Sequence, residues 1–287
     1  MYEMKPKVQL NRQTPCVLLL GGFDGAHVGH KQLFEKAKSY GLPIGVMTIL
    51  GGKGKGLFTL AEREEIFSSL GAQFVLPMRF ENIQTLTPKQ FLDGLLQELN
   101  VKAFVCGQDF RFGFQAAGDV QFLKEYTHGS VEIQNLLQID GEKVATSTIK
   151  NAIEQGKVEQ ANALLTTPFF VKGEVKRDRG IGKTICFPTA NIAYPTGKFP
   201  LKQGVYHTQV KVGEKTYQAI TNYGARPTFD NDSVWTETHL IDFDGDLYGQ
   251  TLNVQFIRFL REIQKFDSAQ ALQSQLQQDK RSVLSYD

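Results

Sequence analysis

Two histidines lie inside a glycine-rich segment near the N-terminus, and this arrangement suits phosphate chemistry. Residues 20–30 read L-G-G-F-D-G-A-H-V-G-H, so His27 and His30 stand three positions apart. Glycines let the backbone turn sharply and approach a ligand, and the helix expected to follow offers unpaired N–H groups. Imidazolium groups there would hold phosphate oxygens while negative charge builds in a transition state. A strand–helix junction that needs glycine only for its geometry is the competing interpretation, and zinc is disfavoured because no third ligand stands nearby.

A second glycine-bearing loop leads into a segment with neutral oxygen donors. It reads G-I-G-K-T-I-C-F-P-T-A-N and begins at Gly180. Gly180 and Gly182 would let backbone N–H groups cradle a phosphate, with the charge of Lys183 beside them. Thr189 and Asn191, two positions apart, point to the same side of an extended chain, and both carry oxygens of the kind that Mg²⁺ prefers.

Glu237 is the candidate general base of this second site. It stands in the segment V-W-T-E-T-H, at the start of an expected strand, where Thr236 and Thr238 would face the opposite side. A carboxylate that projects toward the mouth of a barrel can take the proton of a substrate hydroxyl. A solvated strand residue is the competing interpretation.

The elements that position the first site alternate between short apolar strands and helices. This alternation predicts an α/β domain with a doubly wound, Rossmann-like parallel sheet, whose ligands bind at the carboxyl ends of the strands. The expected strands are 17–20, 44–49, 74–78 and 103–106, and the expected helices are 30–39, 60–70 and 88–99.

After about residue 150 the pattern changes to segments of period two. A helical pattern over 150–165 is broken near Gly156, and a last helical pattern covers 268–278. The strands between them predict a small antiparallel β-barrel with the last helix packed against it. We therefore expect one domain over residues 1–155 and a second over 156–287. The expected strands of the second are 170–176, 205–212, 216–222, 238–243 and 251–259.

Composition and charge disfavour several classes of protein. The 287 residues suit two domains, and a net charge of +2 without a basic stripe argues against nucleic acid as a partner. Three separated cysteines form neither a disulfide framework nor a metal-ligand pair, which fits a cytoplasmic protein. No apolar run approaches the ~20 residues of a membrane span. The partners expected are therefore small molecules, and the oligomeric state is open.

The first glycine segment is similar to the signature of HxGH nucleotidyltransferases. It resembles most the N-terminal module of prokaryotic bifunctional riboflavin kinases/FMN adenylyltransferases (FAD synthetases), whose G-x-D-F-x-F-G segment matches residues 107–113. The resemblance implies that the phosphate of FMN attacks the α-phosphorus of ATP and that pyrophosphate leaves. It assigns His27 and His30 to catalysis at the ATP phosphates. It places Gly21, Phe23, Asp24, Gly25, Gly29, Ser147, Thr148 and Lys150 at the nucleotide, and Asp109, Phe110 and Phe112 at the flavin.

The second loop resembles the riboflavin kinase fingerprint G-x-x-x-F-P-T-A-N, and later segments follow in the family's order up to D-L-Y-G at 246–249. The resemblance implies that ATP phosphorylates riboflavin with Mg²⁺ as cofactor. Thr189 and Asn191 would bind Mg²⁺–ATP, and Glu237 would deprotonate the 5′-hydroxyl. Tyr206 and Arg261 are candidate flavin contacts from their residue types, with the barrel core and the surface as their competing interpretations.

The chain departs from the family pattern mainly in its first half. Residues 48–56, T-I-L-G-G-K-G-K-G, replace the family's F-x-P-H-P loop, and Lys150 replaces an arginine, which keeps the charge but loses the bidentate fork. In the second half, Cys186 stands at a usual glycine. The altered loop is either an exposed glycine loop or a remodelled clamp for the FMN phosphate. Two alternatives therefore stand beside a bifunctional enzyme: an enzyme that keeps one activity, more readily the kinase, and a non-catalytic regulator that binds flavin or nucleotide.

Overall fold

The computed structural model of the protein describes residues 5–6, 13–52, 54–127, 130–135, 137–139, 141–177, 189–225 and 234–286. The chain divides into two units, Met1–Thr146 and Ser147–Asp287. The division falls earlier than the predicted boundary after residue 155, because α6 (Thr146–Glu154) belongs with the second unit: the backbone N–H of Lys202 donates to the carbonyl of Ile153. Within these residues, no helix is long and apolar enough to cross a membrane.

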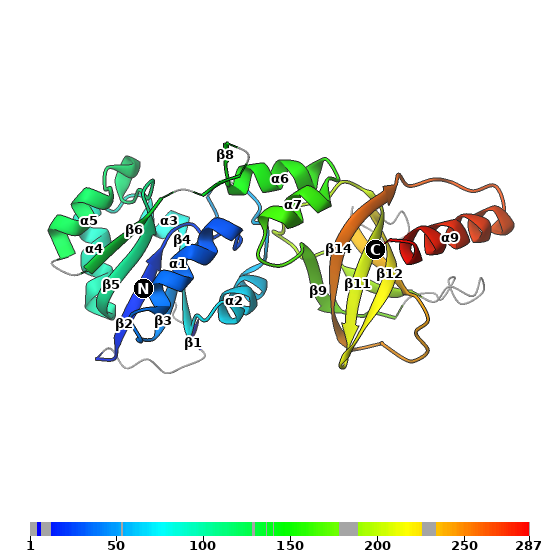
Figure 1. Cartoon of the computed structure of the whole chain (residues 1–287), viewed down its shortest axis with the longest axis horizontal. Helices are drawn as coiled ribbons and strands as arrows, with labels where there is room; N and C mark the ends of the chain where they lie inside the picture. The colour runs from blue at the N-terminus through cyan, green and yellow to red at the C-terminus, as the bar shows by residue number, and fades with distance from the viewer. Residues whose placement is uncertain are drawn as a thin grey trace. The chain divides into compact units, whose positions relative to one another are not determined.

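A six-stranded sheet forms the centre of the first unit, as predicted (Figure 1). Five strands are parallel and the short edge strand β1 runs antiparallel to β4. The four predicted strands are confirmed, and the edge strands β1 and β6 were not predicted. The order across the sheet is β1 (Lys5–Pro6), β4 (Phe74–Arg79), β3 (Ile44–Leu50), β2 (Pro15–Leu20), β5 (Asn100–Gly107) and β6 (Ser130–Gln134).

Helices cover both faces of this sheet. The connections from β2 to β3 and from β3 to β4 run in one direction, which puts α1 and α2 on one face, and the return to β5 puts α4 on the other. Leu18 and Leu20 pack with Phe91 and Leu95 of α4 in one core cluster. The helices are α1 (Val28–Lys38), α2 (Leu60–Ser69), α3 (Phe80–Ile83), α4 (Pro88–Glu98) and α5 (Val120–Thr127), with a hairpin of β7 (Gln138–Ile139) and β8 (Glu142–Lys143) after β6.

The strand order reverses between β2 and β5. After β2 the chain moves outward through β3 and β4, and then returns to add β5 on the other side of β2. At such a reversal the loops that leave two neighbouring strands diverge at the carboxyl ends and open a crevice. The loop after β2 carries His27, and the loop after β5 carries Asp109.

The second unit is a nearly closed antiparallel barrel (Figure 1). A bridge between Lys176 and Asn191 joins its two edge strands, and the Lys176 N–H donates to the Asn191 carbonyl over 2.8 Å. The strand expected over 238–243 is present but begins and ends earlier, because β13 spans Val234–Leu240 and places Glu237 in its middle. The order is β10 (Ala190–Ala193), β13 (Val234–Leu240), β12 (Lys215–Ala225), β11 (Gly204–Val212), β14 (Thr251–Arg261) and β9 (Phe170–Glu174).

In the described part of the second unit, three helices accompany the barrel. The break predicted near Gly156 is confirmed, since this residue has a φ of +80° between α6 and α7 (Val158–Leu164). Asn162 fastens α7 to the barrel: it accepts from the Phe169 N–H and donates to the Phe256 carbonyl, both at 2.8 Å. The last helix, α9 (Ala269–Leu284), is longer than predicted and packs Val283 against the barrel wall.

A substitution at Gly45 in β3 would test how tightly the first sheet is packed. A Cβ atom at this position would lie 2.1 Å from the ring of Phe74, its partner on β4. We expect Gly45→Ala to lower the free energy of unfolding by about 1–3 kcal/mol, because the buried ring has no space to move. Phe74→Leu in the same chain should recover part of that loss. Denaturant unfolding measures both, and an unchanged curve for Gly45→Ala would contradict the packing described.

Candidate active sites

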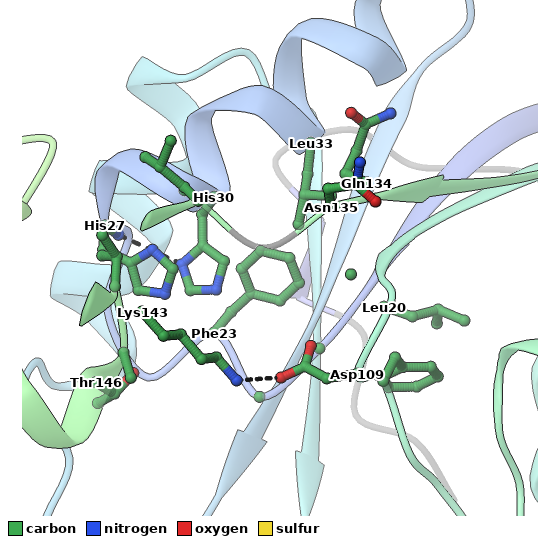
Figure 2. A pocket seen from close by; sticks show the side chains of 18 of the residues that line it. Leu20, Phe23, His27, His30, Leu33, Asp109, Gln134, Asn135, Lys143 and Thr146 are labelled. Carbon is green, nitrogen blue, oxygen red and sulfur yellow. Dashed lines mark hydrogen bonds and ion pairs between the residues drawn. The ribbon is translucent and has the colours of Figure 1, made fainter. Parts of the chain in front are cut away.

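The crevice between the loops after β2 and β5 holds a pocket of about 410 Å³. The start of α1 and the β7–β8 hairpin complete its walls (Figure 2). Both expected histidines face it, so the glycine segment and the segment after β5 meet as predicted. The predicted residues that line it are Gly21, Phe23, His27, Gly29, His30, Asp109 and Phe110.

The two histidines form a rigid pair at the start of α1. His27 is the N-cap of the helix, and its ring stacks on that of His30 with centroids 3.5 Å apart. The Nδ1 atom of His30 lies 3.0 Å from the carbonyl oxygen of Gly25 and 3.3 Å from the backbone N–H of His27. A Cβ at Gly29 would meet the His27 ring at 3.1 Å, so glycine lets this ring lie against the helix.

Burial keeps both histidines neutral in the free pocket. It lowers the pKa of His27 to about 4, with a further lowering from Lys143 and an opposing effect of Asp109. The pKa of His30 is lowered well below its usual value, first by burial and then by His27, against a hydrogen bond to Gly25. The imidazolium form that was expected to hold phosphate in the transition state is therefore disfavoured while the pocket is free, because desolvation disfavours the charged form.

Lys143 is a cationic residue of this pocket that sequence reasoning missed. It lies on β8 and pairs with Asp109 across the pocket, with Nζ 2.5 Å from the carboxylate (Figure 2). Asp109, expected at the flavin, thus shares the wall with the histidines. In the sequence, Lys143 is marked only by its place two residues before the 145–150 segment. It lies in a hairpin whose strands are too short to show the alternation of a strand.

The conformation of the turn after β2 requires glycine at position 21 and buries the ring of Phe23. Phe23 adopts a positive φ of +41° and is 2% exposed. A Cβ at Gly21 would lie 2.8 Å from the Phe23 ring, so only glycine allows the turn to close over it. The ring then packs against His30 with centroids 4.6 Å apart and forms the floor beneath the histidines.

Asp24, expected at the nucleotide, forms an ion pair with the buried Arg63 and is itself half-buried. Its carboxylate lies 2.6 Å from the guanidinium of Arg63 on α2 and also accepts from the Leu57 N–H at 2.8 Å. Arg63 donates further to the carbonyls of Ile49 and Phe58. The pair therefore fastens both ends of the altered loop to the turn that carries the histidines.

Gly25 is likewise structural here. Its carbonyl oxygen receives the His30 contact, and a Cβ would meet Leu57 at 3.1 Å.

The altered loop is exposed at its tip, and a second pocket lies beside its first end. Gly51 and Gly52 are exposed and have positive φ values. The second pocket, of about 340 Å³, has a mostly apolar wall that includes Phe112 from the expected flavin set. Three residues line both pockets, so the two adjoin: Ile49, Phe110 and Arg111.

Three expected nucleotide residues lie on α6, in the second unit. Ser147 and Thr148 are exposed in the first turn of this helix. Lys150 places its ammonium group 5.4 Å from the centre of the Phe199 ring.

The barrel brings the expected metal ligand and the expected base together. Asn191 on β10 is the direct partner of Glu237 on β13. Thr236 and Thr238 are fully buried on the opposite face, as predicted, while Glu237 is half-buried. Thr189 comes just before β10 and lines a pocket of about 230 Å³ whose wall includes Asp244 to Tyr248. Gly180, Gly182 and Lys183 lie outside the described residues.

The two expected flavin contacts of the barrel are placed elsewhere. Tyr206 is 0% exposed in the barrel core, where its ring packs edge-on against Phe256 and its hydroxyl donates to the Lys202 carbonyl. Its strand face points inward, which periodicity alone did not reveal. Arg261 donates from two nitrogens to the carboxylate of Asp279 and thereby ties α9 to β14.

Known families match both units. The riboflavin kinase family model matches residues 165–286, and the FAD synthetase family model matches residues 9–148. The bifunctional riboflavin kinase/FMN adenylyltransferase of Bacillus subtilis is 31% identical, over 96% of this chain and 93% of its own. The protein of the same description from Escherichia coli K12 is 33% identical, over 93% of this chain and 91% of its own.

One solved structure is similar along nearly the whole chain. It is a crystal structure described as a macrolide-efflux protein from Streptococcus pneumoniae, with 29% identity and a TM-score of 0.86. The match covers 99% of this chain and 98% of that one. The same two folds in the same order are therefore present in that protein.

The neutral histidines predict a loss of stability in mild acid. The folded pKa of His27 is about 4, below the ordinary value near 6.5 of an unfolded chain. Between these values the unfolded chain binds a proton that the folded chain does not, so stability falls as pH decreases through about 6.5. We expect His27 to account for about 2 kcal/mol of lost unfolding free energy at pH 5 relative to pH 7.5. Hydrogen exchange of α1 amides measures the loss, and His27→Gln should reduce it; equal losses in both proteins would contradict the assignment.

Because Arg63 joins several segments of the first unit, we expect its substitution to lower the stability of that unit strongly. Arg63→Met removes the guanidinium from the Asp24 carboxylate and from the carbonyls of Ile49 and Phe58, and we expect the free energy of unfolding of the first unit to fall by about 3 kcal/mol. Hydrogen exchange over residues 44–58 reports it. Arg79→Met is the matched control, because Arg79 pairs with Glu81 on the exposed surface, where such a pair contributes about 0–1 kcal/mol. Similar effects of the two variants would refute the anchoring role.

Proposed function

Because this chain belongs to the family of bifunctional riboflavin kinases/FMN adenylyltransferases, we propose that its described pockets and strand pairs are the sites of the two reactions. The enzyme phosphorylates riboflavin to FMN and transfers an adenylyl group from ATP to FMN, which yields FAD and pyrophosphate. The first unit corresponds to the FAD synthetase model and carries the adenylyl transfer. The barrel corresponds to the riboflavin kinase model and carries the phosphorylation.

The adjoining pockets of the first unit support the placement of ATP and FMN. The pocket with the stacked histidines and Lys143 suits the triphosphate, because it joins a helix start to cationic and N–H donor groups. The apolar pocket suits the isoalloxazine ring, with Phe80, Phe91 and Phe112 in its wall. Since both pockets share Ile49 and Phe110, a flavin in one and a nucleotide in the other would be neighbours.

The histidines act in this scheme as adjustable hydrogen-bond donors. His30 can direct Nδ1–H to the Gly25 carbonyl, and a proton on Nε2 would then meet a phosphate oxygen. A triphosphate brings negative charge that offsets the burial of an imidazolium. The two rings thus gain positive charge when the anion arrives, and they hold the leaving pyrophosphate. Lys143 exchanges its Asp109 partner for phosphate in the same step.

One observation carries the kinase assignment: Asn191 and Glu237 are direct partners on adjacent strands. The amide of Asn191 and the hydroxyl of Thr189 are neutral oxygen donors, which fit Mg²⁺ because this ion prefers oxygen ligands and is commonly bound with substrate phosphates. When bound, Mg²⁺ neutralises charge on the transferred phosphoryl group. Glu237 takes the proton of the riboflavin 5′-hydroxyl, whose oxygen attacks the γ-phosphorus of ATP while ADP leaves.

The separate sites predict that single substitutions will divide the two activities. Purified protein is incubated with ATP and Mg²⁺ plus either riboflavin or FMN, and the flavins are resolved chromatographically. Glu237→Gln should reduce FMN formation by about 10²-fold or more and leave FAD formation from FMN intact. His27→Ala should do the converse, by about 10²-fold, since it removes a donor to the phosphates.

Each outcome decides a specific point. Loss of both activities in either variant would mean that the residues are assigned to the wrong units. FMN formation without FAD formation in the unaltered protein would leave the kinase as the only retained activity. No product from either flavin would favour a regulator that binds without turnover.

A further inference from the structure

A row of polar side chains crosses the barrel at the level of Glu237. The strand register pairs Glu237 with Asn191 of β10 on one side and with Asn222 of β12 on the other. Partners in antiparallel strands project to the same face, with Cβ atoms about 4.5–5.5 Å apart. The strand register therefore places Glu237 between two asparagines on the same face, of which only Asn191 has a role so far.

Asn222 stands where this row changes from polar to apolar. Its partner on the far side is Val205 of β11. Val205 belongs to an apolar cluster with Ile220 and with Val283 of α9. An apolar side chain at position 222 would continue that cluster, so packing does not explain the asparagine.

The amide oxygen of Asn222 is buried and unpaired. Its Oδ1 atom finds no hydrogen-bond donor in the described part of the chain. A buried acceptor without a donor destabilises the resting protein, and a catalytic role is one of the explanations for such a group in a native protein. Glu237 in its ionised form cannot supply one, because a carboxylate has only acceptor oxygens.

The kinase reaction creates the missing donor beside it. As the riboflavin 5′-oxygen bonds to the γ-phosphorus and the bond to ADP breaks, the hydroxyl proton passes to Glu237, which then carries an O–H group. We propose that Asn222 is a positioning residue for this step: it orients the Glu237 carboxyl group and accepts its hydrogen bond once the proton has arrived. This inference rests on the proposed role of Glu237 as the base.

Asn222→Leu tests the proposal in the full-length chain, since leucine keeps the size and removes the amide. With riboflavin, ATP and Mg²⁺, we expect kcat for FMN formation to fall by about tenfold or more, because a general base contributes only when it is correctly placed. The KM for riboflavin should change by less than about threefold, because Asn222 acts through Glu237 and not on the bound flavin. FAD formation from FMN should be unchanged.

A matched control lies in the same barrel. Asn253 on β14 also has a buried, unpaired Oδ1 atom, but its strand partner is Lys172, away from the row. Asn253→Leu should leave kcat for FMN formation within about twofold of the unaltered protein. An equal loss in both variants would make the effect one of barrel integrity and overturn the proposal. If leucine prevents folding of the barrel, Asn222→Ser provides the same comparison.

The double variant separates action through Glu237 from a structural role. In a chain that already carries Glu237→Gln, Asn222→Leu should lower the residual rate by less than about twofold, because the group on which it acts is gone. A second tenfold loss would overturn the proposal. Full FMN formation by Glu237→Gln alone would instead refute the base assignment itself. A strong loss in Glu237→Gln with no loss in Asn222→Leu would refute only the role of Asn222.

Discussion

Hydrogen bonding between neighbouring strands decides which side chains meet in both sites of this enzyme. In the first unit, parallel pairing of β2 with β5 brings two loop starts together at one edge of the sheet. In the second unit, antiparallel pairing sets Asn191, Glu237 and Asn222 side by side across three strands. A shift of one residue in either pairing would turn alternate side chains to the other face and remove the site. The strand register therefore decides which side chains lie together in each proposed site.

Within the first unit, the ion pair of Arg63 with Asp24 fixes the loops at the edge of the sheet in place. Arg63 reaches the turn after β2 through Asp24, the end of β3 through Ile49, and the start of α2 through Phe58. A buried guanidinium provides several donors in a fixed plane, which suits the fastening of separate backbone segments. The exposed glycines between these points can therefore vary in sequence while Ile49 keeps its place in both pockets. This accounts for a well-formed pocket beside a loop that lacks the family's usual residues.

The parts of the structure that follow from local pattern were predictable. His27, His30 and Asp109 line one pocket, and their segments could be recognised because strand ends and glycine turns have signals within a few residues. Asp24 was assigned wrongly because its partner Arg63 lies 39 positions away and shows no local signature. Tyr206 was misplaced because alternation along a strand does not say which face is the core. Lys143 was missed because its strand has two residues, too few for a period to appear.

The closure of the barrel places Asn191, a residue of the proposed kinase site, at the seam between the two edge strands. The backbone of Asn191 accepts the bridge from Lys176 that joins the edge strands, while its side chain lies beside Glu237. Such a seam, held by a short bridge between two edge strands, can open at a lower free energy than the barrel core. Opening it would leave Asn191 beside Glu237, because β10 remains paired with β13, but it would free the outer edge of β10 while the tyrosine and phenylalanine core stays folded. Distortion of this edge on heating can accordingly slow the phosphorylation step before the domain melts.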